Sequence, residues 1–109
     1  MSRKGKVYYK ELYAGNIIED ENEYTFQYAG EYLKNPDARP ISLTLPLRSE
    51  QYSSNVLFSF FDGLIPEGWI LEIAEKNWKI NPRNRMELLL TFCKDTIGAV
   101  SVERIEEEE

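Results

Sequence analysis

Apolar and polar positions alternate along the first thirty residues as they do in β-strands. We predict a strand over residues 7–13, a turn at 14–16 and a returning strand over 17–19. Residues 24–28 alternate strictly, which places Tyr24, Phe26 and Tyr28 on one face. Because the connections are short, the simplest pairing is an antiparallel three-stranded meander. Residues 31–33 are expected to form a short turn of helix or an edge strand.

Two further strands are expected later in the chain. Residues 41–45 alternate with Ile41, Leu43 and Leu45 directed inward, and Pro46 ends this strand. The polar residues 48–53 are expected to be a connection. Residues 99–103 alternate again, and we predict that they close the sheet.

Helical periodicity marks the stretch between these two strands in three blocks. The first block, residues 56–64, is predicted to be a helix with one buried stripe: Val56, Leu57, Phe60, Phe61 and Leu64. The residues before it, Ser53, Ser54 and Asn55, are all candidates for its N-cap. Gly63 suits a left-handed helix stop. A second helix is predicted over 67–80, with Pro66 and Glu67 at its start.

A third helix is predicted to begin at Asn81 and Pro82, and it is apolar on two sides. The two stripes are Met86, Leu89, Leu90 and Cys93 on one side, and Leu88 and Phe92 on the other. Such a helix is buried on both sides, or buried on one and adhesive on the other. The predicted fold class is α+β, a mainly antiparallel sheet of about five strands with three helices packed on one side.

Trp69 lies off the apolar face of the second predicted helix. At 100° per residue, Trp78 falls on that face, whereas Trp69 lies roughly 140° from its centre. Single exposed apolar residues are normal, but tryptophan is enriched at binding hot spots. The ring is therefore either packed under a loop or held out for a partner.

Composition and charge limit the classes of function. With 109 residues we expect one domain over 1–105, followed by an acidic tail at 106–109. The net charge of −6 argues against nucleic acid or an anionic membrane as a direct partner. A single cysteine and the lack of an apolar run of about 18 residues indicate a cytoplasmic location.

No group of residues indicates catalysis, so we predict that the protein is not an enzyme. The sequence has no histidine, the commonest general base and metal ligand. Cys93 is expected to fill the core rather than act as a nucleophile. Asp20, Glu21 and Glu23 lack calcium-loop spacing and are expected to form a solvated turn. We therefore expect no catalytic residues, no metal and no cofactor.

Several motifs together resemble the N-terminal domain of HipA-type serine/threonine kinases, the toxins of bacterial toxin–antitoxin systems. They are Ile41-Ser42-Leu43-Thr44-Leu45-Pro46-Leu47-Arg48, Phe60-Phe61, Leu64-Ile65-Pro66-Glu67-Gly68, Leu88-Leu89 and Asp95-Thr96-Ile97-Gly98-Ala99-Val100. The likeness extends from about residue 7 to residue 102. One departure is Cys93, which stands where the family usually has glycine, and this leaves the local turn geometry open.

The resemblance implies a small subunit similar to HipS of three-component HipBST systems. HipS acts as antitoxin to a HipT-like kinase that lacks this domain, while a separate helix-turn-helix subunit binds DNA. In HipS-like proteins the tryptophan after Pro-Glu-Gly is associated with blocking the kinase, and Trp69 matches it. We therefore expect partner binding by Ile65, Pro66, Glu67, Gly68 and Trp69. The alternative is an N-terminal structural domain that completes or stabilises a HipA-like kinase without inhibiting it.

Overall fold

The computed structural model describes residues 3–21, 23–65, 84–94 and 98–105. Its centre is a five-stranded antiparallel sheet in the order β4-β3-β2-β1-β5. The strands are β1 (Arg3–Tyr9), β2 (Leu12–Asp20), β3 (Glu23–Tyr28), β4 (Tyr52–Ser54) and β5 (Val100–Ile105). The helices in the described residues are α1 (Gly30–Lys34), α2 (Ser59–Asp62) and α4 (Arg85–Phe92). The predicted α+β class with a mainly antiparallel sheet is confirmed.

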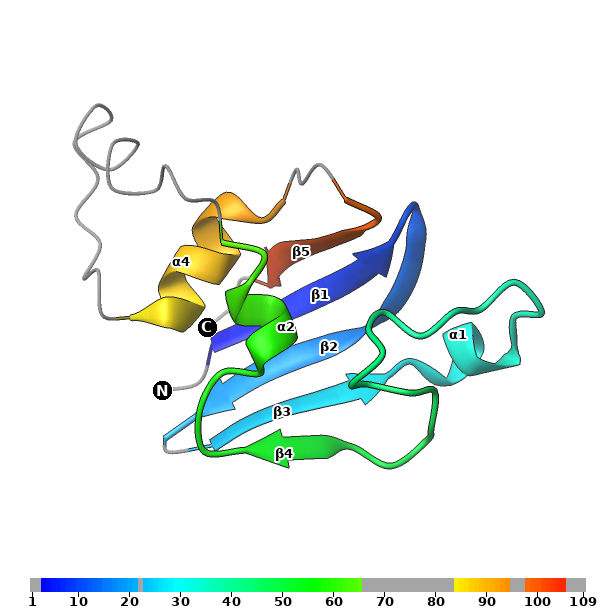
Figure 1. Ribbon diagram of the computed structural model, residues 1–109, viewed down its shortest axis with the longest axis horizontal. Helices are drawn as coiled ribbons and strands as arrows, with labels where there is room; N and C mark the ends of the chain where they lie inside the picture. The colour runs from blue at the N-terminus through cyan, green and yellow to red at the C-terminus, as the bar shows by residue number, and fades with distance from the viewer. Residues whose placement is uncertain (1–2, 22, 66–83, 95–97, 106–109) are drawn as a thin grey trace.

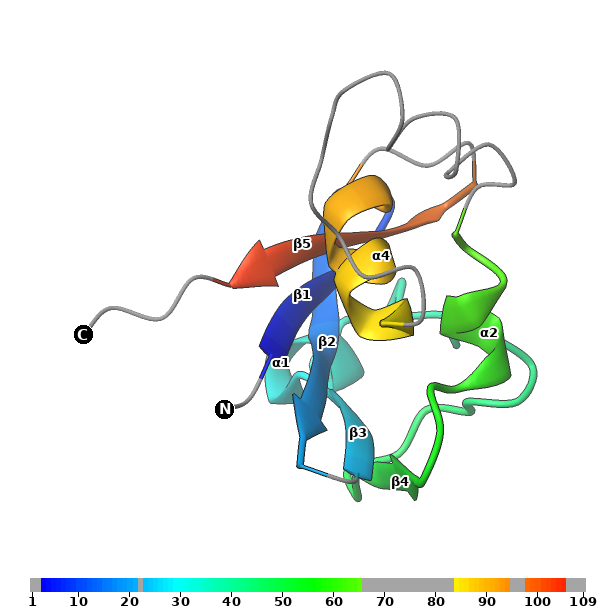
Figure 2. The same cartoon turned by 90° about the vertical axis from the view of Figure 1, so that its left-hand side faces the viewer.

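Two layers make up the fold. α2 and α4 lie on one face of the sheet, and α1 lies beyond the end of β3 (Figure 1). The view turned by 90° shows α4 crossing β1 and β5 on that face, with α2 beside it (Figure 2). Between the layers lies one core, and its fully buried large side chains are Phe26, Phe61, Ile17, Met86, Leu88, Leu89, Val7, Val102 and Cys93.

The first hairpin turns earlier than the sequence predicted. Tyr9 pairs with Leu12, so the turn is at Lys10 and Glu11, and the predicted turn at 14–16 lies inside β2. Lys10 takes a φ of 57°, a left-handed conformation that residues other than glycine rarely adopt. Glycine is required at position 15 because β2 and β3 lie close together there, and not because the chain turns. A Cβ at this position would lie 2.3 Å from the carbonyl oxygen of Gln27.

The predicted strand over 41–45 is wrong, because these residues form a tight turn outside the main sheet. Ser42 and Leu45 form an isolated bridge, and Leu45 N–H donates to the Ser42 carbonyl at 3.1 Å. Ile41 and Leu45 are buried as expected, but Leu43 is 99% exposed. The fifth strand of the sheet is β4, which pairs with β3 and overlaps the end of the predicted connection 48–53 and the N-cap candidate Ser54.

The predicted helix over 56–64 is shorter than expected. α2 begins at Ser59 with Phe58 in the N-cap position, and the stretch 52–54 is β-strand. Val56 therefore falls outside the helix and is 68% exposed, against the prediction. Gly63 has a φ of −69° and a ψ of −14°, so the predicted left-handed stop is also wrong. The helix predicted over 67–80 lies outside the described residues.

α4 is buried on both of its apolar sides, one of the two alternatives that its pattern allowed. Met86, Leu88 and Leu89 are fully buried, and Phe92 is half-buried against the same core. Asn84 caps the helix by accepting the Glu87 N–H at 3.1 Å. The predicted cap, Asn81, lies outside the described residues. Cys93 has a φ of −103°, which any residue adopts, so this turn does not require glycine.

Candidate partner-binding site

Of the five predicted partner-binding residues, Ile65 is the one among the described residues. Pro66, Glu67, Gly68 and Trp69 lie outside them, so their part in binding stays a prediction. Ile65 is 8% exposed and belongs to the core, and its N–H donates to the Asp62 carbonyl at 3.3 Å. The segment that leads into the predicted site is therefore packed against the body of the domain.

Aromatic packing fixes α2, the helix that ends just before Ile65. The ring of Phe61 is fully buried, and its centroid lies 5.5 Å from that of Phe26 on β3. Phe58 and Phe60 flank the same ring at 6.2 and 5.3 Å between centroids. Tilted and edge-on aromatic pairs of this spacing add stabilisation beyond area burial. A helix of four residues is therefore held by its side chains more than by its own hydrogen bonds.

An ion pair joins the end of α2 to the beginning of α4. Arg85 Nε donates to Asp62 Oδ1 at 2.6 Å, with both side chains more than a third exposed. An exposed pair of this kind contributes on the order of 0.2–1 kcal/mol. It links Asp62 to Arg85, close to positions 65 and 84, the two described residues between which residues 66–83 run.

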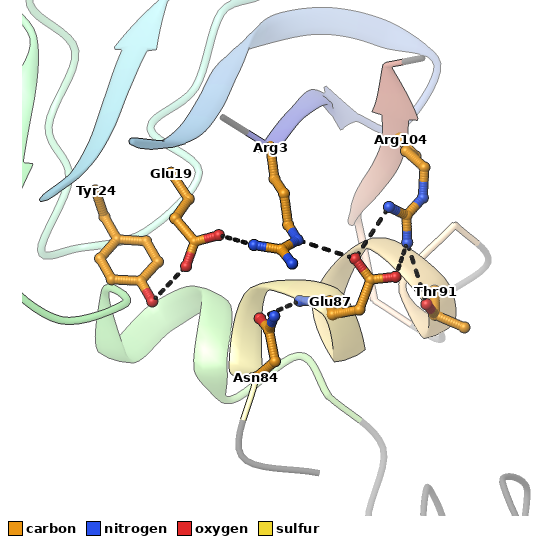
Figure 3. A network of polar contacts seen from close by, with 7 residues as sticks. All are labelled: Arg3, Glu19, Tyr24, Asn84, Glu87, Thr91 and Arg104. Carbon is orange, nitrogen blue, oxygen red and sulfur yellow. Dashed lines mark hydrogen bonds and ion pairs between the residues drawn. The ribbon is translucent and has the colours of Figure 1, made fainter. Parts of the chain in front are cut away.

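A larger network of charges ties α4 to the sheet (Figure 3). The carboxylate of Glu87 accepts hydrogen bonds from Arg104 on β5 and from Arg3 on β1. Arg3 also donates to Glu19 at 2.8 Å, and Glu19 accepts the hydroxyl of Tyr24 at 3.1 Å. α4 and the four strands β5, β1, β2 and β3 are thereby linked through side chains that are only partly exposed to water.

The electrostatics of this network favour ionised Glu87 and Arg3 side chains and a neutral Tyr24 hydroxyl. Hydrogen bonds from Arg104, followed by its charge and by Arg3, hold the pKa of Glu87 below its ordinary value against the opposing effect of burial. The hydrogen bond to Glu19 is the largest cause of the raised pKa of Arg3. Burial, with the Glu19 hydrogen bond, raises the pKa of Tyr24. A carboxylate held ionised between two guanidinium groups is a poor proton acceptor, so the network is structural.

The described residues offer little for catalysis. Cys93 is fully buried, as the sequence predicted, and burial raises the pKa of its thiol to about 12. Asp20, Glu21 and Glu23 are exposed. Among the described residues, no group of three or more histidine, cysteine or acidic side chains is placed to hold a metal ion. None of the described helices has the length and apolar character needed to cross a lipid bilayer.

Two exposed apolar side chains were missed by the sequence analysis. Leu43 and Val56 were both assigned to buried faces, but they are 99% and 68% exposed. No signal in the sequence separated them from their buried neighbours, because both fit the periodic patterns from which the core was predicted.

Comparison with known proteins identifies relatives over nearly the whole chain. Residues 5–103 match the family model described as the HipA N-terminal domain. A protein of Haemophilus influenzae is 30% identical over 103 residues, covering 93% of this chain and 92% of that protein. "Putative kinase Y4mE" of Sinorhizobium fredii is 28% identical over 89 residues, which are 81% of this chain but 21% of that protein.

A solved structure supports the same relationship. The structure described as "N-terminal domain of HipA toxin" superposes with a TM-score of 0.69 at 27% sequence identity. The match covers 97% of this chain and 95% of that one, so it includes the sheet and the helices packed on it.

Proposed function

The chain belongs to the HipA N-terminal domain family, and on that premise we propose that it is a binding subunit that neutralises a HipA-like serine/threonine kinase. In this role it is an antitoxin, and the kinase is the toxin, encoded separately and HipT-like. The observation that carries the proposal is the match of the whole sheet-and-helix domain to the N-terminal domain of HipA toxin. The chain thus has the fold of one part of such a toxin.

The relatives occur in two sizes, which supports a separate subunit. The matched region makes up 92% of the Haemophilus influenzae relative but 21% of the Sinorhizobium fredii relative, which is named as a kinase. The domain is therefore found both as almost an entire small protein and as one part of a much longer one. In the longer relative this domain and the rest of the protein share one chain. We infer that a separate copy of the domain uses the same surface to bind a kinase encoded as another chain.

Inhibition is assigned to Trp69 and the residues before it. We place Trp69 at or beside the ATP cleft of the kinase, presented by the turn of Ile65, Pro66, Glu67 and Gly68. A rigid indole in a desolvated pocket contributes on the order of 2–4 kcal/mol to binding. The described part of the chain supports this role by fixing Ile65 in the core and Asp62 to Arg85.

Several features of the chain agree with a binding role and not a catalytic one. The single thiol is buried with a raised pKa, and Glu87 is held between arginines. The net charge of −6 favours a basic partner surface and disfavours direct contact with nucleic acid. Contact with DNA is therefore proposed to be indirect, through a helix-turn-helix subunit, and the proposed location is that of the kinase, the cytoplasm.

The test is co-expression with a HipA-like kinase that lacks an N-terminal domain of this kind. We expect the two proteins to co-purify and growth to recover when this chain is present. A kinase that co-purifies with the chain but remains toxic supports the second candidate, a domain that completes or stabilises the kinase without inhibiting it. That candidate is favoured by the Sinorhizobium fredii relative, in which the matched region is part of the longer protein. Absence of any complex rules out both candidates.

A further inference from the structure

A fully exposed leucine stands at the tip of a well-fixed turn. Leu43 is 99% exposed, whereas Ile41 and Leu45 on either side of it are buried. The turn is closed by the hydrogen bond from Leu45 N–H to the Ser42 carbonyl, and Ser42 Oγ accepts the Thr44 N–H at 3.2 Å. A leucine side chain this exposed adds no buried apolar surface to the folded protein.

The base of the turn is anchored by the hydroxyl of Tyr28. This oxygen accepts the Ile41 N–H at 3.0 Å and donates to the Leu45 carbonyl. The Tyr28 ring is buried, and burial raises the pKa of its hydroxyl to about 12. Because both ends of the turn are held by one buried group, Leu43 is presented in a fixed position. A fixed position lowers the entropic cost of inserting the side chain into a partner.

Val56, the second exposed apolar residue, lines a groove next to this turn. The groove has a volume of about 290 Å³ and is lined by Thr44, Leu45, Tyr52, Ser54, Val56, Leu57, Phe58 and Ser59. No charged side chain is among these residues, although 29% of the sequence is charged. Leu43 adjoins the groove through its neighbour Thr44. We call Leu43, Val56 and this groove the apolar anchor surface.

We propose that the apolar anchor surface is a second contact site for the partner kinase, with Leu43 and Val56 buried on binding. This inference rests on the proposed function and adds a contact that is independent of Trp69. The kinase segment that fits is apolar and uncharged, because charged groups would be desolvated in a groove that offers no opposite charge. Nucleic acid is disfavoured as the occupant by the net charge of −6.

Continuity along α2 argues for the kinase as occupant. Phe58 and Ser59 form one wall of the groove and begin α2, and the same helix leads within a few residues to Ile65. A partner that contacts both the apolar anchor surface and the chain at Ile65 spans one short helix, α2. Two side chains and one groove are small beside the roughly 1,200–2,000 Å² of a stable interface. This surface is therefore suited to extend a larger contact and not to hold a second copy of the chain by itself.

The test compares kinase binding by full-length variants. Leu43→Ser with Val56→Ser is expected to weaken binding to the proposed partner kinase by about tenfold or more, measured by calorimetry or surface plasmon resonance. Thermal unfolding should change little, because neither side chain belongs to the buried core. Leu12→Ser is the matched control, since Leu12 is an exposed leucine that lines a different groove beside Asp37 and Arg39. It should bind as the wild type does.

The outcomes separate this inference from the proposed function. A wild-type chain that does not bind the kinase overturns the proposed function and this inference with it. A wild-type chain that binds, with a double variant that binds equally well and is equally stable, overturns this inference alone. Sedimentation of the wild-type chain alone should show a monomer. A dimer that dissociates in the Leu43→Ser variant, with kinase binding unaffected, overturns the assignment of the surface to the kinase.

Discussion

The carboxylate of Glu87 in α4 receives both arms of the Arg104 guanidinium in β5, at 3.1 Å from Nη1 and 2.8 Å from Nη2. Paired bonds of this geometry are stronger and more directional than single ones. Arg3 in β1 adds a third bond at 3.1 Å. The first turn of α4 is thereby held to two neighbouring strands, and this fixes the described chain on the C-terminal side of residues 66–83.

Removing the charge of Glu87 should destabilise the domain. In Glu87→Gln the two guanidinium groups lose their shared anion, at a cost of about 1–2 kcal/mol for a partly exposed network. The melting temperature should fall by about 4–8 °C for each kcal/mol, measured by circular dichroism. Glu103→Gln, which neutralises an exposed acid on β5, is the control and should melt as the wild type does. Equal melting of all three proteins would show that the network is not stabilising.

The same network should make stability depend on pH. The pKa of Glu87 is lowered in the folded protein from an ordinary value of 4.5, chiefly by the hydrogen bonds from Arg104. On acidification the unfolded chain takes up this proton first. The stabilisation is therefore fully present above about pH 5.5 and is lost as the pH falls through the lowered folded pKa. Urea unfolding across the acidic range should show a steeper loss for the wild type than for Glu87→Gln, and parallel curves would contradict this account.

Gly15→Ala should be far more damaging than Gly30→Ala. At position 15 a Cβ would lie 2.3 Å from the Gln27 carbonyl oxygen and 3.0 Å from Tyr28 Cα, both backbone atoms that cannot move alone. Forcing β2 and β3 apart is expected to cost about 2–4 kcal/mol. At position 30 nothing lies within 4 Å of the added atom, so the change should stay within about 0.5 kcal/mol. Denaturant unfolding of the two variants measures the difference, and similar losses would argue against this register of β2 and β3.

Trp69→Ala should abolish most kinase binding without unfolding the chain. Loss of about 2–4 kcal/mol corresponds to roughly 30- to 1,000-fold weaker binding. The readouts are binding to the purified kinase and growth rescue on co-expression. Trp78→Phe serves as control, because Trp78 is predicted on the buried stripe and its ring should not meet the partner. A folded Trp69→Ala protein that binds and protects fully would remove the basis of the proposed mechanism.

The fold class follows from the sequence because alternation and helical spacing report burial directly. These periods placed Phe26 and Tyr28 of β3 on one face and gave α4 two apolar sides, and Phe26, Tyr28, Leu88 and Leu89 are all buried. Alternation does not separate a strand from a tight turn. Ile41 and Leu45 point inward in both, so the exposed Leu43 between them could not be recognised.

Other predictions were wrong because glycine is used both in turns and where two strands lie close together. Gly15 and Asn16 are residue types typical of a turn, but glycine is required at position 15 because β2 and β3 lie close together there. Gly63 resembles a left-handed stop, but it continues in right-handed geometry after α2. The charge network around Glu87 could not be predicted either, because Arg3, Glu19 and Arg104 are brought together by strand order alone. The predicted site residues from Pro66 to Trp69 lie outside the described residues and stay a prediction.

Autophosphorylation of the proposed partner kinase, measured with increasing amounts of this chain, tests the central claim most directly. The account predicts that phosphate incorporation falls as the chain is added and levels off once the kinase is saturated. Trp69→Ala should leave the reaction close to its uninhibited rate at the same concentrations. Incorporation that is unchanged or raised by saturating wild-type chain would contradict the account, and a rise would identify the chain as a part that completes the kinase.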